Sequence, residues 1–299
     1  RVLFRSWFAI GALIAMVVSF FIDSVILQFS VFLICSTILL FATIFCGTAL
    51  YAQSITGYDI MKKADEVPEP KTGSMKATMT LVNKKGQTKT REVIEKTKDF
   101  GDIKKTAIVF TIPKDVAGVG YLMFEYKENS DGSKKNSDNW LYMPAAKKVR
   151  RISGSEGSGD FMGTDFTYDD MGDRGLNKDS FTLLGEESVD ADGKSIECYK
   201  VECVAKDTTE KNPRRIVWIS KDNFLLIKGE FFDRQNNLQR VLECSDIKQI
   251  DGIWTTGKMY IKNVLTNHST LLEMKDVKYN VPLKDNIFTV AALERGTSR

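Results

Sequence analysis

Four acidic residues lying close together are the strongest candidates for metal chemistry in this chain. Asp165, Asp169, Asp170 and Asp173 offer the oxygen ligands that calcium prefers. Their spacing does not fit the EF-hand loop, and a polar side chain before a helix commonly caps its first turn. We therefore expect Asp165 or Thr164 to cap a short helix that runs through Asp170. We predict no metal site and no cofactor.

The residue types that usually supply a nucleophile or a base do not form a recognisable catalytic set. The sequence contains one histidine, His268, beside Asn267 in an expected turn, which argues against His-based triads and His-rich metal sites. Ser245 and Lys248 match the S-x-x-K motif and 137–139 reads S-D-N. Their order is reversed and no K-T-G follows, so the penicillin-binding pattern fails. We predict that the protein is not an enzyme.

Cysteine chemistry is also weakly supported. Cys198 and Cys203 are five positions apart, so on one strand they point to opposite faces and cannot form a disulfide with each other. A bond from either residue to Cys244 remains possible on sequence grounds. The chain has no C-x-x-C motif, which argues against a zinc or redox site.

Apolar chemistry is better represented, in methionines and in a cluster of aromatic residues. Methionine is flexible and suits surfaces that accept variable apolar partners. These side chains form either an ordinary core or a surface that holds an acyl chain. The methionines of the expected sheet and the cluster are Met79, Met123, Met143, Met162, Met171 and Met259, with Phe161, Phe166 and Tyr168.

Composition describes an ordinary globular protein with a long apolar start. The 299 residues are 43% hydrophobic and 27% charged, and the net charge of +3 is too balanced for a nucleic-acid partner. Apolar runs at 7–22 and 25–50 indicate an export signal or a membrane anchor over residues 1–52. The opening Arg-Val-Leu-Phe-Arg-Ser back-translates to a common sequencing adapter, which suggests that residues 1–24 are not native. We predict a mature protein that begins near Gln53, and a single domain over residues 53–299.

The elements of that domain follow from its periodicity. Ile55 to Val67 has apolar residues every third position, which predicts a short helix ended by Pro68. From Gly73 the period is two, with turn signals such as Asp192-Gly193. We predict a mainly β fold: one large curved antiparallel sheet of ten or eleven strands, a half-barrel with a few short helices covering its concave face.

One stretch resembles a known family. The residues that carry the resemblance are Trp140-Leu141-Tyr142-Met143-Pro144, Lys148-Val149-Arg150-Arg151-Ile152 and Phe161-Met162-Gly163-Thr164-Asp165-Phe166-Thr167-Tyr168-Asp169-Asp170-Met171. They resemble the bacterial outer-membrane lipoprotein-sorting protein family, relatives of periplasmic lipoprotein carriers with the LolA/LolB fold. The resemblance extends over about 55–293. It implies a periplasmic protein that works beside inner-membrane transporters of the resistance-nodulation-division type.

The leading hypothesis is a periplasmic carrier that holds a lipid or a lipoprotein acyl chain in an apolar cavity of the sheet. The second is a membrane-tethered module that grips a protein partner or regulates such a transporter. We expect 153–159 to act as a hinge for a lid over 161–171, so that Phe166→Asp abolishes fatty-acid binding without unfolding the sheet. The predicted cavity and lid residues are Trp140, Tyr142, Phe161, Met162, Phe166, Tyr168, Met123, Met79 and Trp218.

Overall fold

The structure is a computed structural model that describes residues 14–16, 20–21, 28, 33, 55–128 and 134–296. The residues from Ile55 onward form one compact unit. The predicted apolar segments of residues 1–52 and the turn at Asp131-Gly132 lie almost entirely outside the described residues. No helix among the residues described is long and apolar enough to cross a membrane.

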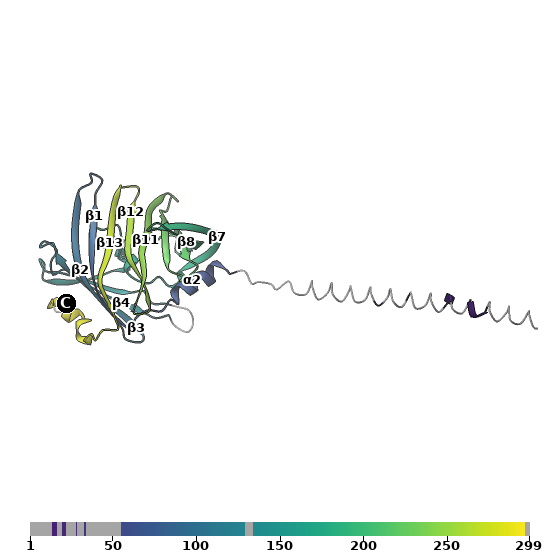
Figure 1. Cartoon of the computed structure of the whole chain (residues 1–299). Helices are drawn as coiled ribbons and strands as arrows, with labels where there is room; N and C mark the ends of the chain where they lie inside the picture. Colours follow the sequence, from purple (N-terminus) through teal and green to yellow (C-terminus); the bar gives the residue numbers. More distant parts are fainter. Residues whose placement is uncertain are drawn as a thin grey trace, which may run out of the picture. The chain divides into compact units, whose positions relative to one another are not determined.

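A single curved, unclosed antiparallel sheet organises the compact unit, as predicted (Figure 1). Its thirteen strands within the described residues exceed the ten or eleven expected. The strands are β1 (Thr72–Val82), β2 (Thr88–Asp99), β3 (Ile103–Ile112), β4 (Gly120–Tyr126), β5 (Asp138–Met143), β6 (Lys148–Ile152), β7 (Asp179–Ala191), β8 (Lys194–Ala205), β9 (Arg214–Ser220), β10 (Leu226–Phe232), β11 (Leu238–Ile250), β12 (Ile253–Asn263) and β13 (His268–Tyr279).

The strand order explains where the chain must cross the sheet. Neighbouring strands run β6-β5-β4-β3-β2-β1-β13-β12-β11-β10-β9-β8-β7, so β1 pairs with β13 in the middle. The two edge strands, β6 and β7, are therefore consecutive in the chain. Residues 153–178, which we call the connector, join these two edges and so must pass across one face of the sheet.

The two faces of the sheet can be named from this connector. The inner face is the one that the connector covers, and it carries Ile108, Tyr121 and Leu141 from β3, β4 and β5. The outer face of the same strands carries Leu122 and Trp140 and is covered by the C-terminal segment. Strand alternation assigns the remaining side chains to one face or the other.

The helices are short and lie at the ends of the sheet. Helix α2 (Gly57–Asp65) begins with a capping box in which Thr56 and Asp59 bond each other's backbone amides. Ile60 is fully buried against β8 and β9, while Tyr58 is 50% exposed. The predicted stripe is confirmed in part, because Ile55, Met61 and Ala64 pack against the cluster around Ile60. The fully buried positions are Gly57 and Ile60, because α2 lies against the backbone of β7.

The remaining helical segments are single turns, apart from a short C-terminal helix. Helix α3 (Val290–Glu294) buries Leu293 on the outer face, beside Phe288. The 3₁₀ turns are η1 (Gly154–Glu156), η2 (Phe161–Gly163), η3 (Asp169–Met171), η4 (Leu176–Lys178) and η5 (Asp285–Ile287).

Candidate functional site

The connector is an ordered loop, although it contains no helix longer than one turn. Phe161 N donates to Phe166 O at 2.7 Å and Tyr168 N donates to Gly159 O at 3.1 Å, so the loop closes on itself. Met162 and Gly163 both have positive φ, at 51° and 74°, which reverses the chain between the aromatic residues. The predicted short helix through Asp170 is not formed: two isolated turns, η2 and η3, take its place.

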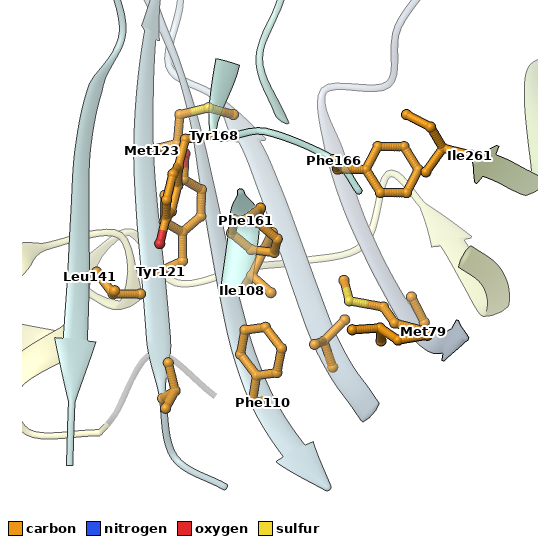
Figure 2. Packing of buried hydrophobic residues seen from close by; sticks show 14 of the residues in the cluster. Met79, Ile108, Phe110, Tyr121, Met123, Leu141, Phe161, Phe166, Tyr168 and Ile261 are labelled. Atoms are coloured by element: carbon orange, nitrogen blue, oxygen red, sulfur yellow. The ribbon is translucent and has the colours of Figure 1, made fainter. Parts of the chain in front are cut away.

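Aromatic side chains of the connector fill the inner face (Figure 2). Phe161 is fully buried, and its ring centroid lies 5.2 Å from that of Tyr121 and 6.1 Å from that of Phe110. Tyr168 packs against Phe161 at 5.4 Å. Figure 2 shows Phe166 on the other side of this group, beside Ile261 of β12. The connector thus covers this part of the inner face, and helix α2 covers the same face over β8 and β9, so the predicted helical cover is present only in part.

A buried arginine fixes the connector to strand β11. Arg240 is 3% exposed, and its Nη1 donates to Asp165 O at 2.9 Å and to Asp170 Oδ2 at 2.5 Å. Its Nη2 donates to Asn212 Oδ1 at 2.9 Å. The guanidinium group also lies 4.6 Å from the ring of Phe231. A buried charge of this kind is tolerable only because it is paired and hydrogen-bonded.

A second polar anchor joins the connector to β13. The buried Asp165 carboxylate accepts from Thr270 Oγ1 at 2.8 Å and lies 2.7 Å from His268 Nδ1. Thr270 Oγ1 in turn accepts from Asp165 N at 3.1 Å. The expectation that Asp165 or Thr164 caps a helix was wrong, because Asp165 bonds to a strand far away in sequence. His268 lies at the start of β13 and contacts the connector, where we expected only a turn.

The C-terminal end of the connector is tied by a cluster of charges. Lys104 Nζ lies 2.7 Å from Asp173 Oδ2, 3.1 Å from Glu69 Oε1 and 3.5 Å from Glu125 Oε2. Burial opposes charging of Lys104, but these carboxylates outweigh it and raise its pKa. Burial raises the pKa of Glu125, while Lys104 holds the pKa of Asp173 below its usual value. Among the described residues, no group of three acidic, histidine or cysteine side chains is arranged to hold a metal.

The structure divides the nine predicted site residues into three groups. Six lie together in the core between the connector and the inner face: Met79, Met123, Phe161, Met162, Phe166 and Tyr168.

The other three do not face the connector, and the expectation that they join it is corrected. Trp140 and Tyr142 pack on the outer face with Phe288 and Leu293, because Leu141 holds the inward phase of β5. Trp218 lies in a separate cluster with Ile227, on the opposite side of β9 from the residues that contact α2. Strand β5 and strand β9 are apolar on both faces, and each of them thus borders two separate hydrophobic clusters.

Sequence reasoning missed the two polar anchors. One signal was present for Arg240: it occupies the same phase of β11 as Leu242 and Cys244, which are buried. A charged residue at an inward position is unusual and marks a paired site. The three cysteines of the domain are free and buried, so the possible bond to Cys244 is not formed.

Several solved structures resemble this chain, whereas no curated protein matches it. A DUF1329 family protein from Desulfovibrio piger is 32% identical with a TM-score of 0.72, covering 79% of this chain and 97% of that chain. A domain from Vibrio parahaemolyticus named as an outer membrane lipoprotein-sorting protein is 28% identical with a TM-score of 0.72, covering 80% and 98%.

A LolA superfamily protein from Nitrosomonas europaea shares the fold at 19% identity, with a TM-score of 0.59 and coverage of 80% of this chain and 100% of that chain. A family model described as an uncharacterized protein matches residues 102–295. These matches confirm the resemblance drawn from the sequence. The chain belongs to the DUF1329 family and has the fold of the LolA superfamily.

Proposed function

We propose that the domain is a periplasmic carrier that binds the acyl chain of a lipid or lipoprotein on the inner face of its sheet. The observation that carries the proposal is that loop residues, and not a regular element, fill this face over β3 and β4, whereas α2 covers the same face only at β7 to β9. Phe161, Phe166 and Tyr168 occupy apolar space that an acyl chain would also fill. The name of the 28% identical Vibrio domain supports a role in lipoprotein sorting.

Exchange of the connector for an acyl chain is physically reasonable because apolar burial is not directional. Each CH₂ group of a chain contributes about 0.8 kcal/mol when it is buried, so a long chain matches the burial of several rings. Partly buried apolar side chains already border the packed rings and would extend the binding surface: Met162, Met171, Leu226, Phe231, Met259 and Leu272.

The first test is direct. Protein recovered from an exporting bacterial host is extracted under native conditions, and its lipids are identified by mass spectrometry. We expect an acyl-containing lipid in near-stoichiometric amount. Protein that is folded and free of lipid, and that also fails to bind a fluorescent fatty acid, would contradict the proposal. The transporter partner implied by the resemblance stays a prediction.

A matched pair of variants tests whether the inner face is the binding site. Phe161 and Phe288 are both fully buried, on the inner and outer faces respectively. Each change to alanine should cost about 3 to 5 kcal/mol of stability. Only Phe161→Ala should change fatty-acid affinity, making it about tenfold tighter, because the ring no longer competes for the site.

Phe166→Leu is the control that separates an effect on folding from an effect on binding. Phe166 is 6% exposed within the same core, so Phe166→Asp would bury a carboxylate and destabilise the fold as well as block a ligand. Phe166→Leu keeps the apolar character and removes part of the ring. Equal effects of inner-face and outer-face changes on binding would show that the inner face is not the site.

A further inference from the structure

Two buried polar groups on the inner face have no hydrogen-bond partner among the described residues. They are Tyr121 Oη on β4 and Asn139 Oδ1 on β5. Only two other such atoms occur there, the Nε atoms of Arg215 and Arg240, whose guanidinium groups bond through their other nitrogens. In both residues a buried oxygen atom is left without a hydrogen-bond partner.

These two residues are neighbours on the same face. Tyr121 pairs with Leu141 and Met123 pairs with Asn139, so Tyr121 and Asn139 are diagonal neighbours across adjacent strands. Leu141 and Met123 both belong to the core beneath the connector. Diagonal neighbours on antiparallel strands lie about 7 to 8 Å apart, a separation at which one small polar group can contact both side chains.

The burial of both groups works against stability. A buried hydroxyl or amide oxygen without a partner loses its hydrogen bonds to water and gains none in return. Phenylalanine and leucine would fill the same space without this loss. The rings of Phe161 and Tyr168, 5.2 and 5.9 Å from that of Tyr121, cover the site from the connector side. Burial also raises the pKa of Tyr121, so its hydroxyl stays protonated and able to donate.

We propose that Tyr121 and Asn139 recognise the amide group of an amide-linked acyl chain when the connector withdraws. Tyr121 Oη donates to the carbonyl oxygen of the amide, and Asn139 Oδ1 accepts its N–H. An ester offers the carbonyl but no N–H, and a bare hydrocarbon offers neither. This inference rests on the proposed carrier function and names the chemistry of the group that the carrier prefers.

Two probes of equal length separate the contribution of the amide N–H from that of the carbonyl group. N-methyldodecanamide and methyl dodecanoate differ in whether N–H or O follows the carbonyl, and both are measured by displacement of a fluorescent fatty acid. We expect the wild-type protein to bind the amide about fivefold more tightly, as one net hydrogen bond predicts. Asn139→Leu should weaken the amide to the level of the ester and leave the ester unchanged. Tyr121→Phe should weaken both probes by a similar factor.

Control measurements distinguish a failure of amide recognition from a failure of the carrier function. Tyr126→Phe, on the outer face of the same strand, should leave both affinities unchanged. Asn139→Leu and Tyr121→Phe should melt at the wild-type temperature or above it. A wild-type protein that binds neither probe would overturn the carrier function and this inference with it. Equal binding of amide and ester that neither variant alters, or a large fall in melting temperature in both variants, would overturn this inference alone.

Discussion

The inner and outer faces of β4 and β5 are covered in different ways. On the outer face, Trp140 and Phe124 pack with ring centroids 4.8 Å apart, and Lys105 Nζ lies 4.3 Å above the Phe124 ring. The short helix α3 closes this face with Leu293. On the inner face a long loop provides the cover, and polar groups remain without partners. The outer face is therefore built for stability, whereas the inner face gives up stability that a simple core would keep.

The carboxylates of the two faces show the same contrast. Glu95 lies on the inner face, paired with Met75 and Ile108, and burial raises its pKa to about 7. Burial acts in the same sense on the outer-face Asp138, but hydrogen bonds from Tyr126, Lys135 and Arg151 outweigh it and hold its pKa at about 2. The charged form of Glu95 is destabilised by its surroundings, whereas the charged form of Asp138 is stabilised.

The largest expected effect comes from breaking the arginine anchor of the connector. Arg240→Met leaves the Asp165 carbonyl oxygen without this donor, and leaves the partly exposed Asp170 carboxylate with only its bond from Thr167 N. Because the remaining carboxylate is partly exposed, the loss of these hydrogen bonds to a charged group should cost about 1.5 to 3 kcal/mol. Chemical denaturation should show this loss, and limited proteolysis should show faster cleavage within the connector.

Arg151→Met provides the matched control on the outer face. Arg151 also pairs with an aspartate, Asp138, but its side chain is 65% exposed. Exposed pairs contribute about 0 to 1 kcal/mol, so this variant should stay close to wild type. Similar losses in both variants would show that the connector is not held mainly by Arg240.

The sequence predicted the sheet far better than the site. Alternation and turn residues identified the antiparallel strands, because period two follows directly from strand geometry. Alternation along β5 also places Trp140 and Tyr142 on one face and Leu141 on the other, as the structure has them. It could not say which of these two faces the connector covers, since both are apolar and the answer depends on how β6 and β7 are joined across the sheet.

The partners in the two polar anchors could not be predicted because they join residues distant in sequence. Asp165 bonds to Thr270, and Arg240 bonds to Asp170, across separations that only the strand order brings together. The lone histidine had no local partner in its own turn, so local reasoning assigned it no contact. The connector itself was correctly singled out by its aromatic residues, and it is the part of the candidate site that local composition reveals.

The buried Glu95 should make the stability of the protein depend on pH near neutrality. Glu95 titrates near pH 7 in the folded state against an ordinary value of 4.5, so the folded state binds the proton more tightly. Its contribution to stability is complete below about pH 4.5 and is lost as the pH rises to about 7. Glu95→Gln should remove this fall and make the protein about 1 to 2 kcal/mol more stable at pH 8.

Asp138→Asn should show the opposite behaviour. The pKa of Asp138, about 2 against an ordinary 3.8, gives a contribution that is present above about pH 3.8 and is lost as the pH falls towards 2. The variant should lose about 1 to 2 kcal/mol at neutral pH and should show a flatter acid limb. Denaturation curves from pH 2 to 8 check both signs, and parallel curves for the two variants would contradict the contrast between the faces.

The smallest effect compares two tyrosines of strand β4 that face opposite ways. Tyr126 Oη donates to Asp138 Oδ2 at 2.5 Å on the outer face, whereas Tyr121 Oη on the inner face has no partner. Tyr126→Phe removes a hydrogen bond to a charged group, so it should cost about 1 to 2 kcal/mol and raise the pKa of Asp138. Tyr121→Phe removes only an unsatisfied hydroxyl, so stability should be unchanged or should rise by up to about 1 kcal/mol. The same chemical change would then have opposite signs on the two faces, measurable by urea denaturation at pH 7. A destabilised Tyr121→Phe would mean that this hydroxyl serves the fold, and the inner face would lose its clearest mark of a binding surface.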